Sequence, residues 1–307
     1  MISLRLYISI FTIAIFSISL YAKDIETKTI AFAQDDISND FRKAQVLEGL
    51  ESAKRYPNIK YLYSDAKGQT SLMIADIEHF IDIGVDAIIV GTNDDSILND
   101  VIDKAYNRGI KVIILDRGVT TTNYHTFLHS DNIEIGKIGA NYIAQKLKNR
   151  GVVLLFEGLP RADVTKLRTR GFVEEISKHK DIKVIKRVGN YLRRDAIMQM
   201  EKLIKDGIKV DAIFAQSDSM LSGVRSALER YNIDPNSIIT IGCDYTKEAK
   251  LAIKNGKQSA SILFPLGTTL AIDIAIKLLD NQSVAKDILI SVALVREDNI
   301  DLIEPIF

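Results

Sequence analysis

The sequence contains no tryptophan and only one cysteine, Cys243. A single cysteine cannot form an internal disulfide, so the fold must depend on a large hydrophobic core rather than on covalent cross-links. Cys243 follows an apolar run and is expected to be a buried thiol. Its neighbours Gly242 and Asp244 supply no base that would activate it as a nucleophile. Without tryptophan, Phe and Tyr are the only large rings available for stacking contacts.

The chain also has no net charge, because 40 Lys and Arg balance 40 Asp and Glu. Loss of an N-terminal segment that contains Arg5 would change this balance only to 39 against 40. A near-neutral chain gives no electrostatic reason to expect nucleic acid or an acidic membrane surface as a partner.

Motifs for catalysis and cofactor binding are absent as well. There is no Gly-x-Ser-x-Gly elbow, no phosphate-binding loop and no glycine-rich dinucleotide turn. The histidines stand in no spacing that would hold a metal ion: His79, His125, His129 and His179. We therefore expect a protein that is not an enzyme and that carries no cofactor and no metal.

The N-terminus has the order of a Sec signal peptide. In MISLRLYISIFTIAIFSISLYAKD, Arg5 precedes an uncharged, mostly apolar run over residues 6–22, and polar residues follow at once. We expect residues 1–22 to be a signal peptide cleaved after Ala22, which together with the lack of disulfides indicates a bacterial periplasm. The alternative is an uncleaved membrane anchor, since the run is at the short limit for a spanning helix. The residue directly after Ala22 is Lys23 and not a cysteine, which argues against a lipid anchor.

Beyond residue 22, β-branched runs alternate with amphipathic stretches, as in parallel sheets covered by helices. Strands are expected at residues 28–34, 59–66, 85–93 and 111–117, and after a junction at 129–132 at residues 152–158, 182–188, 210–218 and 237–244. The runs at 258–267 and 288–295 flank one helical stretch, which is too little for a third domain. The predicted fold is α/β, with two Rossmann-like lobes, each with a parallel sheet, joined by a three-strand hinge. The expected boundaries are 23–129 plus 262–290 for the N-terminal lobe and 130–261 plus 291–307 for the C-terminal lobe.

Polar side chains follow the ends of the expected strands, where an open parallel sheet binds its ligands. Asp116 and Arg117 come directly after VIIL, and no helical pattern begins behind them. The polar residues at 93–96 have an ordinary alternative role, because Asn, Asp and Ser also cap helices. Two such edges facing each other would form a cleft for a small polar ligand.

Several motifs together resemble one known family. They are VIILDRGVT with HSDNIEIGKIGANYIAQKL, RTRGF at 168–172, DAIFAQSDSMLSGVRSAL at 211–228 and IITIGCD at 238–244. The chain strongly resembles the ribose-type (type 1) periplasmic sugar-binding proteins over nearly all of its length beyond the signal. The related DNA-binding repressors begin with a helix-turn-helix, whereas a signal sequence stands here. The resemblance implies a two-lobe clamp that closes on a ligand and passes it to a membrane partner.

The resemblance also assigns ligand-binding residues by position. Asp116 and Arg117 look like the pair that binds sugar hydroxyls, and Phe41 and Tyr191 lie where the family places rings against the sugar. The full expected set is Asn39, Phe41, Asp116, Arg117, Arg168, Tyr191, Ser217, Asp244 and Leu263. Members that bind ribose have Asn at the position of Ser217 and Gln at that of Leu263, so ribose is not predicted.

Two functions are compatible with this resemblance. The first is the substrate-binding subunit of an ABC importer that captures a small polar ligand, most simply a monosaccharide, and delivers it to the permease. The second is a periplasmic sensory protein that presents a ligand of the autoinducer-2 or small-osmolyte type to a receptor kinase or chemoreceptor. In either case we expect a monomer.

Overall fold

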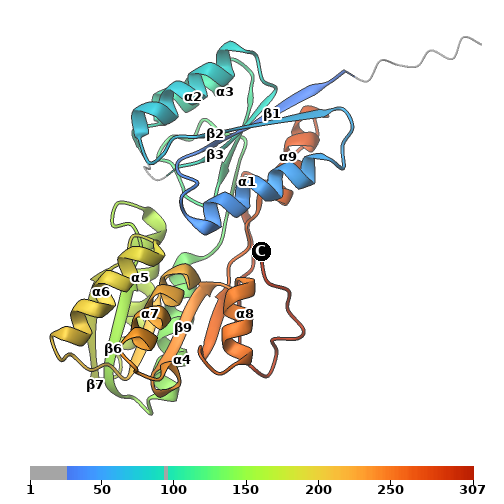
Figure 1. Cartoon of the computed structure of the whole chain (residues 1–307). Helices are drawn as coiled ribbons and strands as arrows, with labels where there is room; N and C mark the ends of the chain where they lie inside the picture. The colour runs from blue at the N-terminus through green and yellow to red at the C-terminus, as the bar shows by residue number, and fades with distance from the viewer. Residues whose placement is uncertain (1–25, 93–95) are drawn as a thin grey trace, which may run out of the picture.

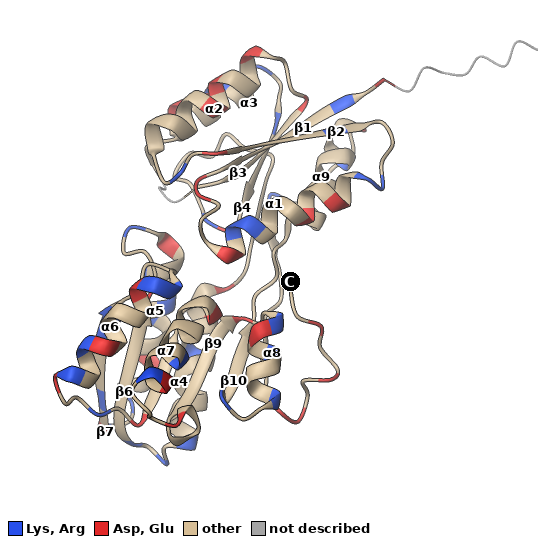
Figure 2. Cartoon of the chain, in the orientation of Figure 1, with Lys and Arg blue, Asp and Glu red and all other residues tan. Residues whose placement is uncertain are grey.

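The computed structural model describes residues 26–92 and 96–307. The expected signal peptide at 1–22 and most of the polar stretch at 93–96 lie outside the described residues. Within them, no helix is both long and apolar enough to cross a membrane. Figure 1 shows two lobes, and Figure 2 shows acidic and basic residues distributed over both, in agreement with the balanced composition.

The first lobe is a six-stranded sheet in which every pairing is parallel. In spatial order its strands are β11 (Asp287–Leu289), β5 (Thr126–His129), β4 (Lys111–Leu115), β3 (Ala87–Gly91), β1 (Lys28–Gln34) and β2 (Ile59–Asp65). Its helices are α1 (Asp40–Ala53), α2 (Thr70–Asp82), α3 (Asn99–Asn107) and α9 (Thr268–Leu279). Alternate residues of β1 enter different cores: Ile30 and Phe32 pack in the cluster with α9, and Ala31 and Ala33 in the cluster with α2 and α3. The sheet is therefore covered on both faces.

The second lobe repeats this arrangement. Its strands, in spatial order, are β12 (Ala293–Val295), β10 (Ala260–Leu263), β9 (Ile239–Asp244), β8 (Ala212–Ala215), β6 (Arg150–Glu157) and β7 (Asp181–Val188). Its helices are α4 (Asn132–Lys146), α5 (Asp163–Ile176), α6 (Arg193–Lys205), α7 (Asp218–Arg230) and α8 (Lys247–Lys254), with the 3-10 turn η1 (Pro235–Ser237). Only the β10–β12 pairing is antiparallel among the described strands. The two mostly parallel sheets confirm the predicted fold class.

Helices α4 and α5 pack closely because two glycines let their backbones meet. A Cβ atom on Gly136 would lie 2.2 Å from the carbonyl oxygen of Arg168, and one on Gly171 would lie 2.1 Å from that of Ile133. Neither distance is possible for a real side chain, so any larger residue would force the helices apart. This packing fixes α5, which carries Arg168, against the sheet.

The chain passes between the lobes three times: from β5 to α4, from β10 to α9, and from β11 to β12. The run at 288–295 was expected as one strand, but it forms two short strands, β11 in the first sheet and β12 in the second. The strand β10 ends at Leu263 and belongs to the second sheet. Residues 262 and 263 were expected in the first lobe, but they pair with β9 of the second lobe. The helix α8 was not predicted.

Candidate functional site: the cavity between the lobes

A cavity lies between the two lobes, with about 310 Å³ of empty space when the part open to solvent is included. It is bounded by the segments that follow β1 and β4 in the first lobe and by α5 and the ends of β8 and β9 in the second. The residues that line it are Asn39, Phe41, Arg42, Asp116, Arg117, Val164, Arg168, Tyr191, Ser217, Asp244 and Phe264. The structure thus brings eight of the nine expected site residues together, all except Leu263.

Leu263 does not line this cavity. Its side chain packs against a hydrophobic cluster of the second lobe that includes Tyr245 and Val295. The next residue, Phe264, lines the cavity instead. Successive side chains of an extended chain point in opposite directions, so a shift of one position moves a residue from the core to the cavity.

Asp116 occupies a strained turn at the end of β4. Its φ of 70° lies in the left-handed region, and its backbone N–H donates to the carbonyl oxygen of Leu128 at 2.7 Å. The carboxylate is buried, and its Oδ1 atom has no hydrogen-bond partner among the described residues. A buried acceptor without a donor costs free energy, so this atom is suited to accept a hydrogen bond from a ligand.

Arg42, which the sequence interpretation missed as a site residue, joins Asp116 to Asp35. Arg42 Nη1 lies 3.2 Å from Asp116 Oδ2, and Arg42 Nε lies 3.4 Å from Asp35 Oδ1. Arg117 Nη1 lies 3.4 Å from Asp35 Oδ2, which makes a buried network of two acids and two bases. Burial raises the pKa of Asp35 and lowers the pKa of Arg42, although the opposite charges of the two groups counteract both shifts.

In the second lobe, protein acceptors hold the guanidinium of Arg168 in place. Arg168 Nε donates to Asn132 Oδ1 and Nη1 to the carbonyl oxygen of Gln216, both at 2.8 Å. The guanidinium carbon lies 4.5 Å from the centre of the Phe264 ring. An arginine that is buried and fixed on both edges presents a cation to the cavity at little further cost in entropy.

Asp244, at the end of β9, is the acid of the second lobe. Burial, and then the neighbouring Asp218, raise the pKa of Asp244 well above its usual value. A carboxyl group that stays protonated can donate a hydrogen bond as well as accept one. The cavity therefore offers an unpartnered carboxylate oxygen at Asp116 and a mixed donor and acceptor at Asp244.

Three rings contribute the apolar part of the wall. Phe41 and Phe264 stack with centroids 5.1 Å apart, and the Tyr191 ring lies 5.7 Å from the guanidinium carbon of Arg117. The Tyr191 hydroxyl is 2.7 Å from Thr165 Oγ1, so the ring is anchored and buried rather than part of the surface. The hydroxyl of Ser217 accepts from the N–H of Met220 and so caps α7 while it lines the cavity.

The comparison with known proteins agrees with this geometry. The family described as "Periplasmic binding protein domain" matches residues 30–283. The chain belongs to the periplasmic binding protein domain family. Its family is one of binding proteins, which confirms the prediction that the chain is not an enzyme. Within the described residues, no group of three or more His, Cys, Asp or Glu could hold a metal ion.

Three relatives of this periplasmic binding protein are informative. The ribose import binding protein of Bacillus subtilis is 31% identical over 234 residues, which cover 76% of this chain and 75% of that protein. A solute-binding protein of an ABC transporter from Bacillus halodurans, with bound myo-inositol, has a TM-score of 0.85 at 25% identity and covers 91% of this chain and 98% of that one. The fructose-binding periplasmic domain of a hybrid two-component system has a TM-score of 0.81 at 26% identity, with 90% and 92% covered.

Proposed function

We propose that this chain is a periplasmic solute-binding protein that encloses one monosaccharide or polyol between its lobes and delivers it to an ABC importer. The observation that carries this proposal is the cavity itself, where the buried and unpartnered Oδ1 of Asp116 lies among stacked rings and fixed arginines. The related binding proteins for ribose and myo-inositol support the same ligand class.

The chemistry of a sugar matches this wall. A sugar ring has apolar C–H faces, which Phe41, Phe264 and Tyr191 can contact, and an equator of hydroxyl groups. Those hydroxyls can donate to Asp116 and accept from Arg117 and Arg168 in charge-assisted hydrogen bonds, which are stronger than neutral ones. A micromolar affinity corresponds to about 8 kcal/mol, which a few such bonds and the ring contacts can supply after the cost of ordering.

Contacts across the cleft support closure around the ligand. Asn39 donates from Nδ2 to the carbonyl oxygen of Tyr191 at 2.9 Å, and the N–H of Gly118 donates to Asp163 Oδ2 at 2.9 Å. Arg161 donates to the carbonyl oxygen of Gly68 at 3.2 Å. Each contact joins the two lobes, which are otherwise linked by three crossing segments that can bend as a hinge.

Export belongs to the same proposal. Membership in a periplasmic binding protein family fits the expected signal peptide at 1–22, cleaved after Ala22, and a mature chain that works as a monomer. Mass spectrometry of the protein purified from its periplasm tests the cleavage. A mature N-terminus at Lys23 supports it, whereas a retained apolar run indicates a membrane anchor.

The binding proposal is tested by thermal shift and calorimetry against monosaccharides, polyols, autoinducer-2 and small amine oxides. A monosaccharide or polyol is expected to raise the melting temperature of the native chain. Asp116→Asn and Arg117→Gln should each weaken its affinity at least tenfold, the effect of about 1.4 kcal/mol. Glu201→Gln, which alters an ion pair with Arg230 within the second lobe, is the matched control. A ligand whose affinity survives both cavity substitutions would overturn the assignment of the site.

A sensory role is the second candidate, and the structural similarity to the fructose-binding domain of a two-component system favours it. The same clamp would then dock on a receptor kinase or chemoreceptor instead of a permease. The neighbouring genes separate the two uses, because permease and ATPase genes indicate import and a kinase gene indicates sensing.

A further inference from the structure

Asp40 makes a contact between the lobes that is separate from the ligand cavity. It is the first residue of α1 in the first lobe, and its Oδ2 accepts from Ser219 Oγ of α7 at 2.7 Å. The same oxygen lies 3.5 Å from Nη2 of Arg193, the first residue of α6. None of these three residues lines the ligand cavity. The contact therefore joins the closed lobes whether or not a ligand is present.

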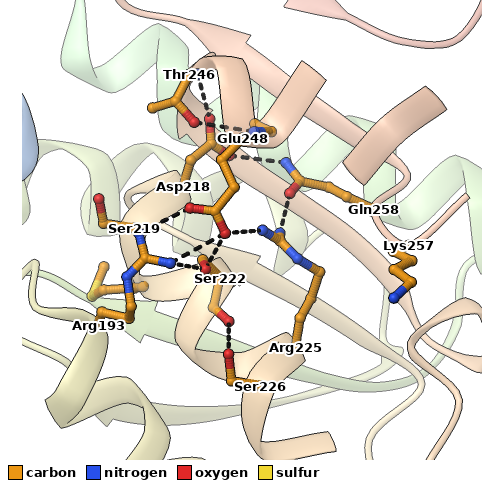
Figure 3. Close-up of polar contacts among 12 residues, drawn as sticks. Arg193, Asp218, Ser219, Ser222, Arg225, Ser226, Thr246, Glu248, Lys257 and Gln258 are labelled. Carbon is orange, nitrogen blue, oxygen red and sulfur yellow. Dashed lines mark hydrogen bonds and ion pairs between the residues drawn. The ribbon is translucent and has the colours of Figure 1, made fainter. Parts of the chain in front are cut away.

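Glu248 of α8 holds Arg193 in position for this contact. Its Oε2 lies 2.9 Å from Arg193 Nη2, its Oε1 lies 3.1 Å from Arg193 Nη1, and Ser222 bonds to both side chains. Figure 3 shows the two side chains of Arg193 and Glu248 converging on Ser222. Burial alone would raise the pKa of Glu248, but the hydrogen bonds from Arg193 and Ser222 lower it, so the carboxylate stays ionised at neutral pH.

The other side of Glu248 is tied to the interior of the second lobe. Glu248 Oε1 accepts from Arg225 Nη2 at 3.0 Å, and Arg225 in turn bonds to Gln258. Gln258 donates to Asp218 Oδ1 at 2.9 Å, and Asp218 Oδ2 accepts from the N–H of Tyr245 at 2.8 Å. All of these residues belong to the second lobe, so hinge opening leaves these contacts intact. Within this network, opening would break only the bonds to Asp40.

We propose that Asp40, Ser219 and Arg193 form a latch that favours the closed form without ligand, and that Glu248 is the positioning residue that keeps Arg193 ready for Asp40. Asp40 and Arg193 are each nearly half exposed, so water screens their attraction. The latch is therefore weak, and its loss should change the ratio of closed to open molecules by about two- to fivefold. A weak latch biases closure and still lets the clamp release its ligand.

The test is single-molecule energy transfer between dyes on the two lobes, in the complete mature chain and with no ligand added. The substitutions Ile83→Cys and Met198→Cys place the dyes at exposed positions of α2's end and α6. The native Cys243 is buried and does not compete for label. Because no ligand is used, the outcome does not depend on whether the chain binds a sugar.

The native chain should show a closed population without ligand. Asp40→Asn and Glu248→Gln should each lower the ratio of closed to open molecules two- to fivefold, and together they should do no more than Asp40→Asn alone, since Glu248 acts on closure only through the contact between Arg193 and Asp40. Glu201→Gln, which alters an ion pair inside the second lobe, should leave the ratio unchanged. Three results would refute the latch. They are a native chain with no closed population, a Glu248→Gln variant that keeps the native ratio of closed to open molecules, and effects of the two substitutions that add in the double variant. If Glu248→Gln has a much lower melting temperature than the native chain, the ratio of closed to open molecules in Asp40→Asn decides whether the latch exists. That substitution leaves the hydrogen bonds within the second lobe intact.

Discussion

Arg42 allows the sharpest test of the buried charge network beside the cavity. The substitution Arg42→Met keeps much of the side-chain volume and removes the cation between Asp35 and Asp116. Both carboxylates then face each other in a buried site with Arg117 as the remaining nearby base. We expect a large loss of stability in the absence of any ligand.

The size of the loss follows from the distances. At the 3.2 Å that separates Arg42 Nη1 from Asp116 Oδ2, the attraction is about 5 kcal/mol with an effective dielectric constant of 20. Part of this attraction offsets the burial of both groups, which the lowered pKa of Arg42 and the raised pKa of Asp35 reflect. Removal of one partner of a buried pair leaves an unpaired charge and costs about 3–5 kcal/mol.

The loss should also depend on pH. Without Arg42, the pKa of Asp35 rises further above its unfolded value, so the folded state gains stability from protonation at low pH and loses it as the pH rises. Arg42→Met should therefore cost less at pH 5 than at pH 7.5. Adding Asp35→Asn, which removes one of the two acids, should restore at least about 1 kcal/mol at pH 7.5.

Urea denaturation at both pH values measures these effects, with Lys257→Met as the matched control. Lys257 forms an ion pair with Glu229 at 2.8 Å on the exposed surface, and its loss should leave the free energy of unfolding nearly unchanged. An Arg42→Met chain that loses less than about 1 kcal/mol, or loses the same amount at both pH values, would contradict the reasoning from buried charge.

The remaining predictions concern packing, titration and the cavity wall. Gly171→Ala should destabilise the fold by about 1–3 kcal/mol in denaturant titration, because its Cβ would clash with a carbonyl oxygen of α4, whereas Gly84→Ala, with no neighbour within 4 Å, tests the backbone strain alone. Burial raises the pKa of Asp218 to about 6, so its contribution to the free energy of unfolding should fall by about 2 kcal/mol between pH 4 and pH 6, and Asp218→Asn should remove this part of the pH dependence. Phe264→Ala should weaken ligand binding in calorimetry more than Leu263→Ala, which instead should lower the melting temperature.

Most of the fold could be predicted because almost every β-branched run forms a strand of a single sheet. The segment at 288–295 shows the limit of this approach. Its eight residues form a continuous run of β-forming type, and nothing in their order marks the point where the chain leaves one sheet for the other. The helix α8 was missed for a different reason: its buried residues Ala249, Ala252 and Ile253 have helical spacing, but the helix is only eight residues long and two of these three residues are alanines.

Some residues of the candidate site could be predicted from the local sequence, and others could not. Asp116 and Arg117 stand out because a charged pair ends a buried strand. Arg42 does not, since its role depends on Asp116, which is far away in the sequence, and a base in the first turn of a helix is usually exposed. The sheet order decides which strand ends meet, and only the folded chain brings Arg42, Asp35 and Asp116 together.

The division of the cavity wall between the lobes determines how a ligand can close the clamp. A ligand shifts the equilibrium between open and closed forms only by the difference in its affinity for the two. Asp116 and Arg117 belong to the first lobe, where ion pairs with Arg42 and Asp35 hold them, and Arg168 and Asp244 belong to the second lobe, where Asn132 and Gln216 hold Arg168. A molecule that reaches only one set binds both forms equally and leaves their ratio where the contacts between the lobes set it. Closure beyond that level therefore requires a ligand with polar groups on both sides of its ring, which is the property that distinguishes a sugar or cyclic polyol from a smaller alcohol.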